Sequence, residues 1–388
     1  MAAVGVICEY NPFHGGHLRQ FAQIRQRLGA DTAIVCLMSG EFVQRGEVAV
    51  FSPAVRAAAA AECGADIVLE LPVTHSLRSA EGFAAGGVEI LSRLGAVDTL
   101  CFGAEHADEA ELLQTAKILC GADYDAALRE ALTARVSYPA ARERALIACG
   151  GDGALLRRPN DILAAEYCKA LVQQKSPLRP LVLPRGGDYH ALDADTENPS
   201  ATAVRALYPG GNWRALVPEA AAALYAGAER FTMAAGERAM LARLRGMAKS
   251  DWETVPYGSE GLWSAVYKAV QHAGSVEEII ESAKSKRYVR TRLQRLLLCA
   301  YLGLTADDLA RPAEFVRVLA LSARGGRLLR RIREEGSIAC LNAGARASEG
   351  AQAEIEARCR GLSTLFSTGT NAPAAALAQK GRVYRRKI

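Results

Sequence analysis

The stretch EYNPFHGGHLRQ, residues 9–20, joins two different sequence patterns. The residues before it, AAVGVIC, are apolar and rich in β-branched side chains, which predicts a short buried strand. After its histidines, Leu18, Phe21, Ile24 and Leu28 recur at the spacing of an amphipathic helix. The stretch therefore lies where a first strand meets a first helix. A helix start offers unpaired backbone N–H groups and a positive dipole end, which suits a phosphate group.

The side chains of this stretch favour phosphoryl chemistry. Gly15 and Gly16 have no side chain, so phosphate oxygens can approach the backbone there. His14 and His17 supply donors for charge that develops on a reacting phosphoryl group. The stretch has no P-loop lysine and no G-x-G-x-x-G, which disfavours a P-loop ATPase and a dinucleotide-dependent dehydrogenase. Two surface histidines on an ordinary glycine turn remain the alternative that these residues alone leave open.

The first 200 residues alternate strands and helices. The strands are predicted at residues 4–8, 32–38, 67–72, 99–103 and 180–184. The helices are predicted at residues 15–28, 53–63, 79–94, 107–120 and 159–173. Apolar strands separated by helices indicate an α/β, Rossmann-like domain with a parallel sheet, in which ligands bind beyond the carboxyl ends of the strands. Because strand signals fade from about residue 206, we expect a catalytic domain at 1–205 and a mainly α-helical, basic region at 206–388.

Charge is distributed unevenly along the chain. Residues 1–200 contain 18 Lys+Arg against 25 Asp+Glu, whereas residues 201–388 contain 29 against 17. Residues 284–333 alone contain 13 basic and 3 acidic side chains. This asymmetry favours a catalytic module joined to a region that binds a polyanion, although arginine-rich helices are equally common as solvated surfaces.

The remaining composition predicts a cytoplasmic protein without a membrane partner. The 10 cysteines include no C-x-x-C pair, which favours reduced thiols over disulfides or a zinc site. No apolar run approaches the ~20 residues of a membrane span, and we see no secretory signal.

A second stretch, NPSATAVRALY at residues 198–208, completes a known pair of signatures. Ser or Thr at a helix start with an arginine on the next turn makes a phosphate clamp. H-G-G-H followed by such a segment resembles the H-x-G-H and late Ser/Thr-basic signatures of the nucleotidylyltransferase superfamily. The resemblance implies a Rossmann-like nucleotidylyltransferase domain in which His14, His17 and Arg205 are catalytic and Ser200 and Thr202 help to bind ATP.

Further blocks narrow the resemblance to one family. In collinear order over about residues 1–300, the chain is similar to the tRNA(Met) cytidine acetate ligase family. The blocks are VICEYNPFHGGHL (6–18), MSGEFVQRGEVAV (38–50), DIVLELP (66–72), FGAEH (102–106), RPNDILAAEY (158–167), DYH (188–190), SATAVR (200–205) and SKRYVRTRLQRLL (285–297). Residues 335–388 match no block.

The resemblance implies an ATP-dependent ligase. Such an enzyme activates acetate as acetyl-adenylate and passes the acetyl group to the exocyclic amine of the wobble cytidine of elongator tRNA(Met), giving 4-acetylcytidine. Mg²⁺ would arrive with the ATP phosphates, and we expect no fixed protein metal site. Two other classes remain as alternatives: a small-molecule adenylyltransferase of cofactor biosynthesis, and a non-catalytic RNA-binding protein on this fold.

The resemblance also implies two sets of binding residues. The ATP-binding set consists of Ile7, Cys8, Glu9, Tyr10, Asn11, Pro12, Phe13, His14, Gly15, Gly16, His17, Leu18, Arg19, Gln20, Gly103, Asn160, Arg185, Ser200 and Thr202. For Asn160, capping of the helix that begins there is the commoner use of such a residue. The tRNA-binding set, basic residues around Tyr288, consists of Lys286, Arg287, Arg290, Arg292 and Arg295. A helix over 285–298 would place Lys286, Arg287 and Arg290 on one face.

Overall fold

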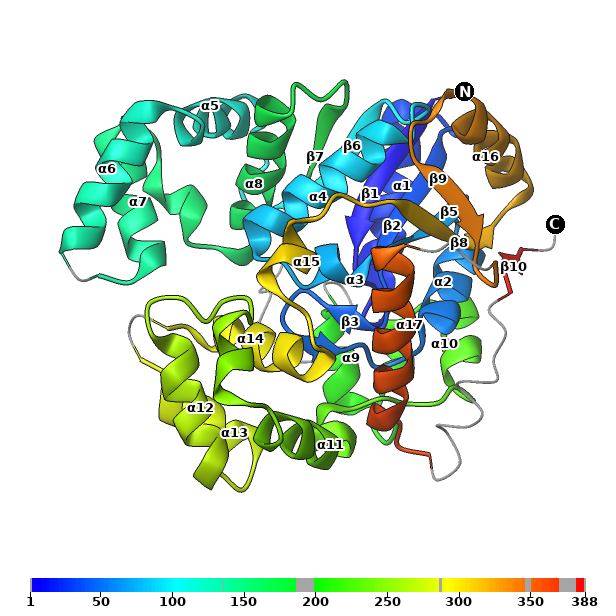
Figure 1. The fold of residues 1–388 in the computed structure, drawn as a ribbon. Coiled ribbons are helices and arrows are strands. Elements are labelled where there is room, and N and C mark those ends of the chain that lie inside the picture. Colours follow the sequence, from blue (N-terminus) through cyan, green and yellow to red (C-terminus); the bar gives the residue numbers. More distant parts are fainter. Residues whose placement is uncertain are drawn as a thin grey trace.

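A mostly parallel sheet lies at the centre of the protein, with helices on both of its faces (Figure 1). The computed structural model describes residues 2–134, 136–185, 199–285, 288–345, 350–369 and 382–386. The strand order is β10-β8-β5-β2-β1-β6-β7, with β9 also paired to β8. The strands are β1 (Ala3–Cys8), β2 (Ala33–Ser39), β5 (Ile67–Leu71), β6 (Thr99–Ala104), β7 (Arg179–Pro184), β8 (Phe315–Leu321), β9 (Ala339–Asn342) and β10 (Tyr384–Arg385).

The predicted α/β pattern of the first half is confirmed. β1, β2, β5, β6 and β7 are the five predicted strands, and they pair in parallel. Every residue of β2 and β5 is buried, because helices cover both faces of the sheet. The five predicted helices are observed within two residues of their expected ends: α1 (Gly15–Leu28), α2 (Pro53–Glu62), α4 (Ala80–Arg93), α5 (Glu109–Leu119) and α8 (Pro159–Gln173).

The second half is mainly helical, as expected. Its helices are α9 (Ala201–Leu207), α10 (Glu219–Tyr225), α11 (Met233–Arg245), α12 (Leu262–His272), α13 (Val276–Ala283), α14 (Arg290–Leu302), α15 (Ala306–Ala310), α16 (Ala323–Glu335) and α17 (Ala351–Ser363). α11 to α14 pack around a second apolar core, which includes Trp252 and Leu297 and also Phe42 from the first half of the chain. No helix within the described ranges has the length and apolarity needed to cross a bilayer.

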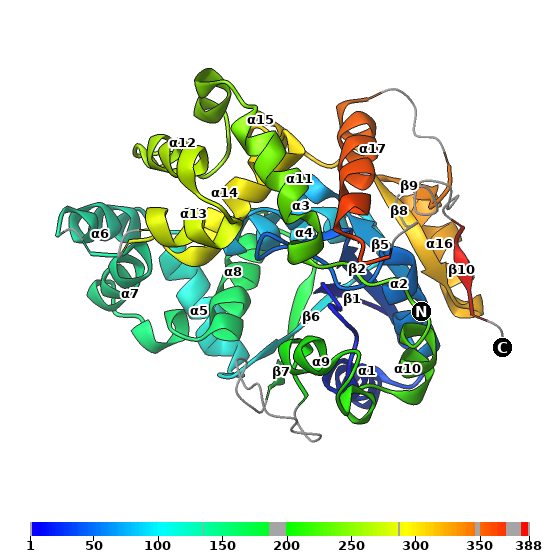
Figure 2. The ribbon, with the colours of Figure 1, turned by 90° about the horizontal axis from the view of Figure 1, so that it is seen from below.

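Strands are nevertheless present in this half, so the expectation that they end near residue 206 is corrected. β8 runs antiparallel to β5, and β9 and β10 extend the same edge of the sheet. β8 is fully buried although it contains Arg317. The Arg317 guanidinium pairs with the Glu356 carboxylate of α17 at 2.9 Å, which compensates its burial. Figures 1 and 2 show β8–β10 with α16 on one side of the molecule and α12–α14 on the other.

Three short insertions complete the first half. α6 (Ala122–Thr133) and α7 (Tyr138–Ala148) form a helical hairpin beyond α5, and α3 (Val73–Ser76) is a single turn after β5. After β2, the strands β3 (Phe42–Val43) and β4 (Glu47–Val48) form a small antiparallel hairpin. Gly46 in this hairpin has φ +80°, and a Cβ there would lie 2.6 Å from the backbone N of Arg295. The hairpin therefore packs directly against α14.

Candidate active site

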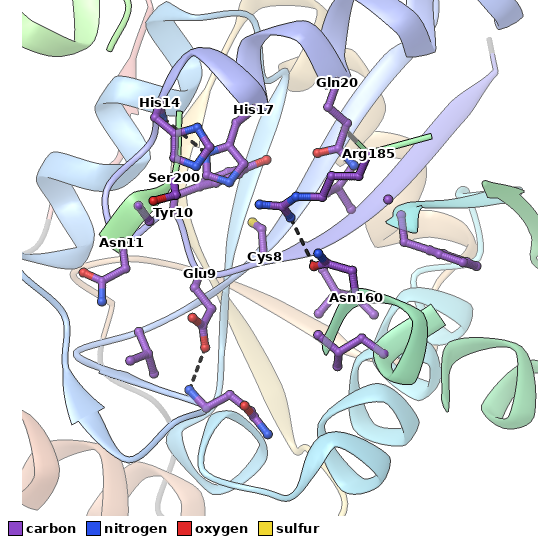
Figure 3. Close-up of a pocket in the computed structure, with 18 of the residues that line it drawn as sticks. Cys8, Glu9, Tyr10, Asn11, His14, His17, Gln20, Asn160, Arg185 and Ser200 are labelled. Atoms are coloured by element: carbon purple, nitrogen blue, oxygen red, sulfur yellow. Dashed lines mark hydrogen bonds between the residues drawn. The ribbon is translucent and has the colours of Figure 1, made fainter. Parts of the chain in front are cut away.

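An open cavity lies at the carboxyl ends of β1 and β6, beside the starts of α1, α8 and α9 (Figure 3). Most of the predicted ATP-binding residues line it: Ile7, Cys8, Glu9, Tyr10, Asn11, His14, His17, Gln20, Gly103, Asn160, Arg185, Ser200 and Thr202, together with the predicted catalytic Arg205. The other members of the predicted loop, Pro12, Phe13, Gly15, Gly16, Leu18 and Arg19, do not line it. Phe13 is instead fully buried, and Leu18 is 39% exposed.

The two histidines are locked to the first turn of α1. His14 is the N-cap residue, and its Nδ1 accepts the Gly16 N–H at 3.1 Å. His17 Nδ1 accepts the His14 N–H at 3.2 Å, which completes a reciprocal capping box. The two rings stack with centroids 3.8 Å apart. A Cβ on Gly16 would lie 2.9 Å from the His14 ring, so this glycine makes room for the imidazole.

This geometry defines the protonation of both rings. Burial, then the charges of Arg185, Arg19 and Arg205, lower the pKa of His14 to about 3. Burial, then His14 and Arg185, lower the pKa of His17 well below its ordinary value. Both rings are therefore neutral near pH 7. Because each Nδ1 accepts a hydrogen bond, the single proton of each ring lies on Nε2, which makes both Nε2–H groups donors.

Arg205 connects the second signature to the first. Ser200 caps α9 by accepting the Ala203 N–H at 3.0 Å, as predicted from the sequence. Arg205 Nη1 donates to the carbonyl oxygen of Asn11 at 2.6 Å, and its Nη2 donates to Thr202 Oγ1 at 3.3 Å. These contacts hold the guanidinium at the cavity before any ligand binds. The starts of α1 and α9 and the Arg205 guanidinium thus lie around the same cavity.

The opposite wall is formed by residues that follow β6 and β7. Arg185 Nη1 donates to Asn160 Oδ1 at 3.2 Å (Figure 3). Asn160 Nδ2 donates to Glu105 Oε1 at 2.6 Å. Asn160 is not the cap of α8, because the N-cap position is Arg158. The alternative of helix capping for Asn160 is therefore excluded. Gly103 lies beside Arg185, since a Cβ added at Gly103 would lie 3.7 Å from the Arg185 Cβ.

Arg56 organises the cavity from behind, and sequence reasoning missed it. It is fully buried in α2 and donates to the carbonyl oxygens of Glu9, Gly40 and Phe51. These oxygens belong to the segments that follow β1 and β2, so one guanidinium ties both strand ends together. In the sequence, the one indication of this role was a lone arginine on an alanine-rich helix.

Gln44, in the turn between β3 and β4, also lines the cavity.

The predicted tRNA-binding residues that the structure describes, Arg290, Arg292 and Arg295, differ in exposure from exposed to buried. Lys286 and Arg287 lie outside the described residues, and α14 begins at Arg290 rather than at residue 285. Arg290 is exposed and pairs with the Glu277 carboxylate. Arg292 donates to the Tyr257 carbonyl oxygen at 3.0 Å. Arg295 is 8% exposed, with its guanidinium 4.9 Å from the Tyr257 ring centroid, so we withdraw it from the RNA-contacting set.

A cavity with these two helix starts, at the carboxyl ends of parallel strands, defines the class of α/β nucleotidyltransferases. In agreement, the family model described as HIGH Nucleotidyl Transferase matches residues 1–376. The solved structure of Thermotoga maritima TmcAL in its apo form I superposes with a TM-score of 0.90, at 25% identity and 100% coverage of both chains. The same enzyme bound with alpha-thio ATP gives a TM-score of 0.88 at 26% identity, again with full coverage.

Curated relatives define the family more narrowly. The tRNA(Met) cytidine acetate ligase of Acetivibrio thermocellus is 35% identical over 364 residues, covering 87% of each chain. That of Syntrophomonas wolfei is 34% identical over 366 residues, covering 89% of this chain and 87% of its own. The chain therefore belongs to the tRNA(Met) cytidine acetate ligases, within the HIGH nucleotidyl transferases.

Proposed function

We propose that this chain joins acetate to the wobble cytidine of elongator tRNA(Met) in two steps within one cavity. In the first step, an acetate oxygen bonds to the α-phosphorus of ATP and pyrophosphate leaves. In the second, the exocyclic amine of cytidine attacks the acetyl carbon, AMP leaves with the electron pair of the C–O bond, and the amine loses a proton. The names of the relatives and the ATP analogue bound to TmcAL support this assignment.

The pair of neutral, capped histidines is the observation that carries the proposal. Two Nε2–H donors at the start of α1 suit the charge that grows on the α-phosphate oxygens as acetate attacks. A neutral imidazole donates a hydrogen bond but binds the negatively charged pyrophosphate product less tightly than an imidazolium would. Their positions are set by backbone hydrogen bonds, so little reorganisation is needed during the reaction.

The remaining residues of the cavity divide between the two ends of ATP. Arg205 and the start of α9 at Ser200 suit the departing pyrophosphate, because a fixed guanidinium and a helix start both favour phosphate. Gly103, Asn160 and Arg185 suit the nucleoside end, which lies against the carboxyl ends of β6 and β7. Acetate would bind between these two groups, next to the α-phosphate.

Mg²⁺ is expected to accompany the ATP phosphates. Among the described residues there is no cluster of three or more His, Cys, Asp or Glu side chains that could hold a metal ion. The imidazole and guanidinium groups of the cavity fit a metal that is bound mainly by phosphate oxygens and water. When bound, the ion neutralises charge on the phosphates, while the protein groups orient them.

The tRNA is expected to approach from the α14 side. Of the predicted contacts we retain Lys286, Arg287, Arg290 and Arg292, whose charges suit phosphate. The β3–β4 hairpin links α14 to the cavity, since Gln294 Nε2 donates to Glu47 Oε1 at 3.1 Å. We place the protein in the cytoplasm, where its tRNA substrate is found.

Incubation with ATP and labelled acetate, with and without elongator tRNA(Met), tests the proposal. We expect acetate-dependent exchange of pyrophosphate into ATP without tRNA, and 4-acetylcytidine at the wobble position with it. Labelled acetyl groups on a phosphorylated small molecule, or no acetate-dependent exchange, would contradict the proposal.

A further inference from the structure

A carboxylate lies on the wall of this cationic cavity. Among the described residues that line the cavity, only Glu9 and Glu47 are acidic. Glu47 already accepts a hydrogen bond from Gln294. A partly buried carboxylate beside ATP opposes the binding of a polyanion unless it has another partner. A ligand group that donates a hydrogen bond to Glu9 would offset this cost.

The Glu9 carboxylate is held in a defined position. Its Oε1 accepts the Gln44 N–H at 2.7 Å, and the side chain extends from the end of β1 into the cavity (Figure 3). The carbonyl oxygen of Glu9 accepts from the buried Arg56, so the backbone beneath the carboxylate is fixed as well. Within the described residues, the hydrogen bond to the Glu9 carboxylate is the one that Oε1 accepts, and none is made to Oε2. One oxygen is thus anchored by the protein, and a ligand could donate to the other.

Glu9 lies on the side of the cavity opposite the nucleoside end. In the sheet, β2 and β6 flank β1 on opposite sides. Gly103 lies near the end of β6 and Arg185 follows β7, whereas Gln44 belongs to the hairpin that follows β2. Arg295 Nη1 of α14 donates to the Gln44 carbonyl oxygen at 3.4 Å. The wall that carries Glu9 therefore adjoins the helix expected to face the tRNA.

We infer that Glu9 is the catalytic base of the acetyl-transfer step, an inference that rests on the proposed function. Its Oε2 accepts a hydrogen bond from the exocyclic amine of the acceptor cytidine. As the amine nitrogen bonds to the acetyl carbon of acetyl-adenylate, the acetyl C–O bond breaks and its electron pair leaves with AMP. The amine proton passes to the Glu9 carboxylate and then to water.

The electrostatic surroundings of Glu9 agree with this role. Burial raises the pKa of the Glu9 carboxyl, while the Gln44 N–H and the charges of Arg45, Arg205 and Arg56 oppose the rise. A carboxylate with a raised pKa is a stronger base. The same oxygen would repel the carbonyl oxygen that uridine carries in place of the amine, so Glu9 also favours cytidine over uridine.

Glu9→Gln tests the inference, because the amide keeps the shape of the side chain and removes the base. The measurement is single-turnover transfer from chemically prepared acetyl-adenylate to elongator tRNA(Met), without ATP. We expect the transfer rate to fall by about 100-fold or more, the usual range for loss of a general base. The rate of acetate-dependent pyrophosphate exchange should fall by less than about 10-fold, because the base acts only in the transfer step. Glu354→Gln removes the same charge from the exposed surface of α17, outside the cavity, and should slow transfer less than threefold.

Three results would overturn the inference. They are transfer by Glu9→Gln within threefold of the parent, equal losses in transfer and exchange, and Glu9→Asp no faster than Glu9→Gln. Glu9→Asp keeps the carboxylate on a side chain that is one methylene shorter. If Glu9→Gln does not fold, Glu9→Asp is compared with Glu9→Ala instead, and its transfer rate must be higher than that of Glu9→Ala. Failure of the parent protein itself to transfer acetyl from acetyl-adenylate would instead contradict the proposed function.

Discussion

The candidate active site and the basic helix α14 hold their basic side chains in different ways. In the cavity, His14 is buried and His17 half-buried, and both are neutral and held by backbone hydrogen bonds within one helix turn. On α14, Arg290 is exposed and pairs with Glu277, and Arg295 is buried against Tyr257. In the proposed reaction, the first region places donors where charge develops on the phosphate. The second has charges that are already partly compensated by the protein itself.

This difference explains why one region was easier to recognise than the other. A capping box depends on residues three positions apart, so the sequence stretch contains the whole arrangement. The partners of α14 lie 13 residues away for Arg290 and 35 residues away for Arg292. Charge counting cannot reveal such partners. Motifs with local geometry therefore predict sites better than clusters of like charge do.

The largest expected effect follows from removal of a cavity donor. His17→Ala should lower acetate-dependent pyrophosphate exchange by about 100-fold or more at saturating ATP, since a preorganised donor is worth ~3 kcal/mol in the transition state. His14→Ala should behave likewise. His106→Ala, which removes a surface imidazole that contacts Glu111, is the matched control. Exchange by His17→Ala within a few-fold of the parent would remove the histidines from the chemistry.

Arg205 should show a smaller, mixed effect. Arg205→Ala is expected to raise the KM for ATP by roughly 10-fold and to lower kcat as well, because a fixed guanidinium binds phosphate in both ground and transition states. Arg205→Lys keeps the charge but loses the contacts to Asn11 and Thr202. It should recover ATP affinity better than kcat. An unchanged KM for ATP in Arg205→Ala would contradict the proposal that the Arg205 guanidinium binds a phosphate of ATP.

On the basic side, charge removal should affect tRNA but not acetate activation. Replacing Lys286, Arg287 and Arg290 with Ala should flatten the log–log salt dependence of tRNA binding by about two to three units if all three contact phosphate. Pyrophosphate exchange should stay near normal. Arg295→Met should instead lower the melting temperature with no change in the salt dependence, because this side chain is buried. If the salt dependence of tRNA binding is the same in the triple variant as in the parent, these residues are only exposed to solvent and do not contact tRNA.

The smallest effect concerns pH. With a pKa of about 3, the His14 ring stays neutral from pH 5.5 to 7.5, and burial lowers the pKa of His17 well below its ordinary value as well. An ordinary histidine would gain a proton below its pKa of ~6.5. The rate of pyrophosphate exchange at saturating ATP and acetate should thus change less than twofold over this range. A one-proton rise in rate centred near pH 6.5 would show that a histidine titrates there.

Much of the fold was accessible from the sequence, for an identifiable reason. The strands of the first half are continuous apolar runs, and their helices begin at caps such as Ser52 and Ser200. β8 was missed because Arg317 interrupts its apolar pattern, and its partner Glu356 lies 39 residues further along the chain. For the cavity, the two signatures were sufficient to find His14 and Arg205. The role of Arg56 depends on three carbonyl oxygens that only the folded chain brings together.

The path of the acetate oxygen tests the central claim most directly. If the cavity directs acetate to the α-phosphorus, turnover with ¹⁸O-labelled acetate and unlabelled ATP must place one ¹⁸O in the phosphate of AMP. Mass spectrometry of AMP, pyrophosphate and inorganic phosphate after complete turnover measures this. The account predicts ¹⁸O in AMP and none in pyrophosphate. Label in inorganic phosphate, with unlabelled AMP or ADP, would show activation at the γ-phosphorus and would contradict the account.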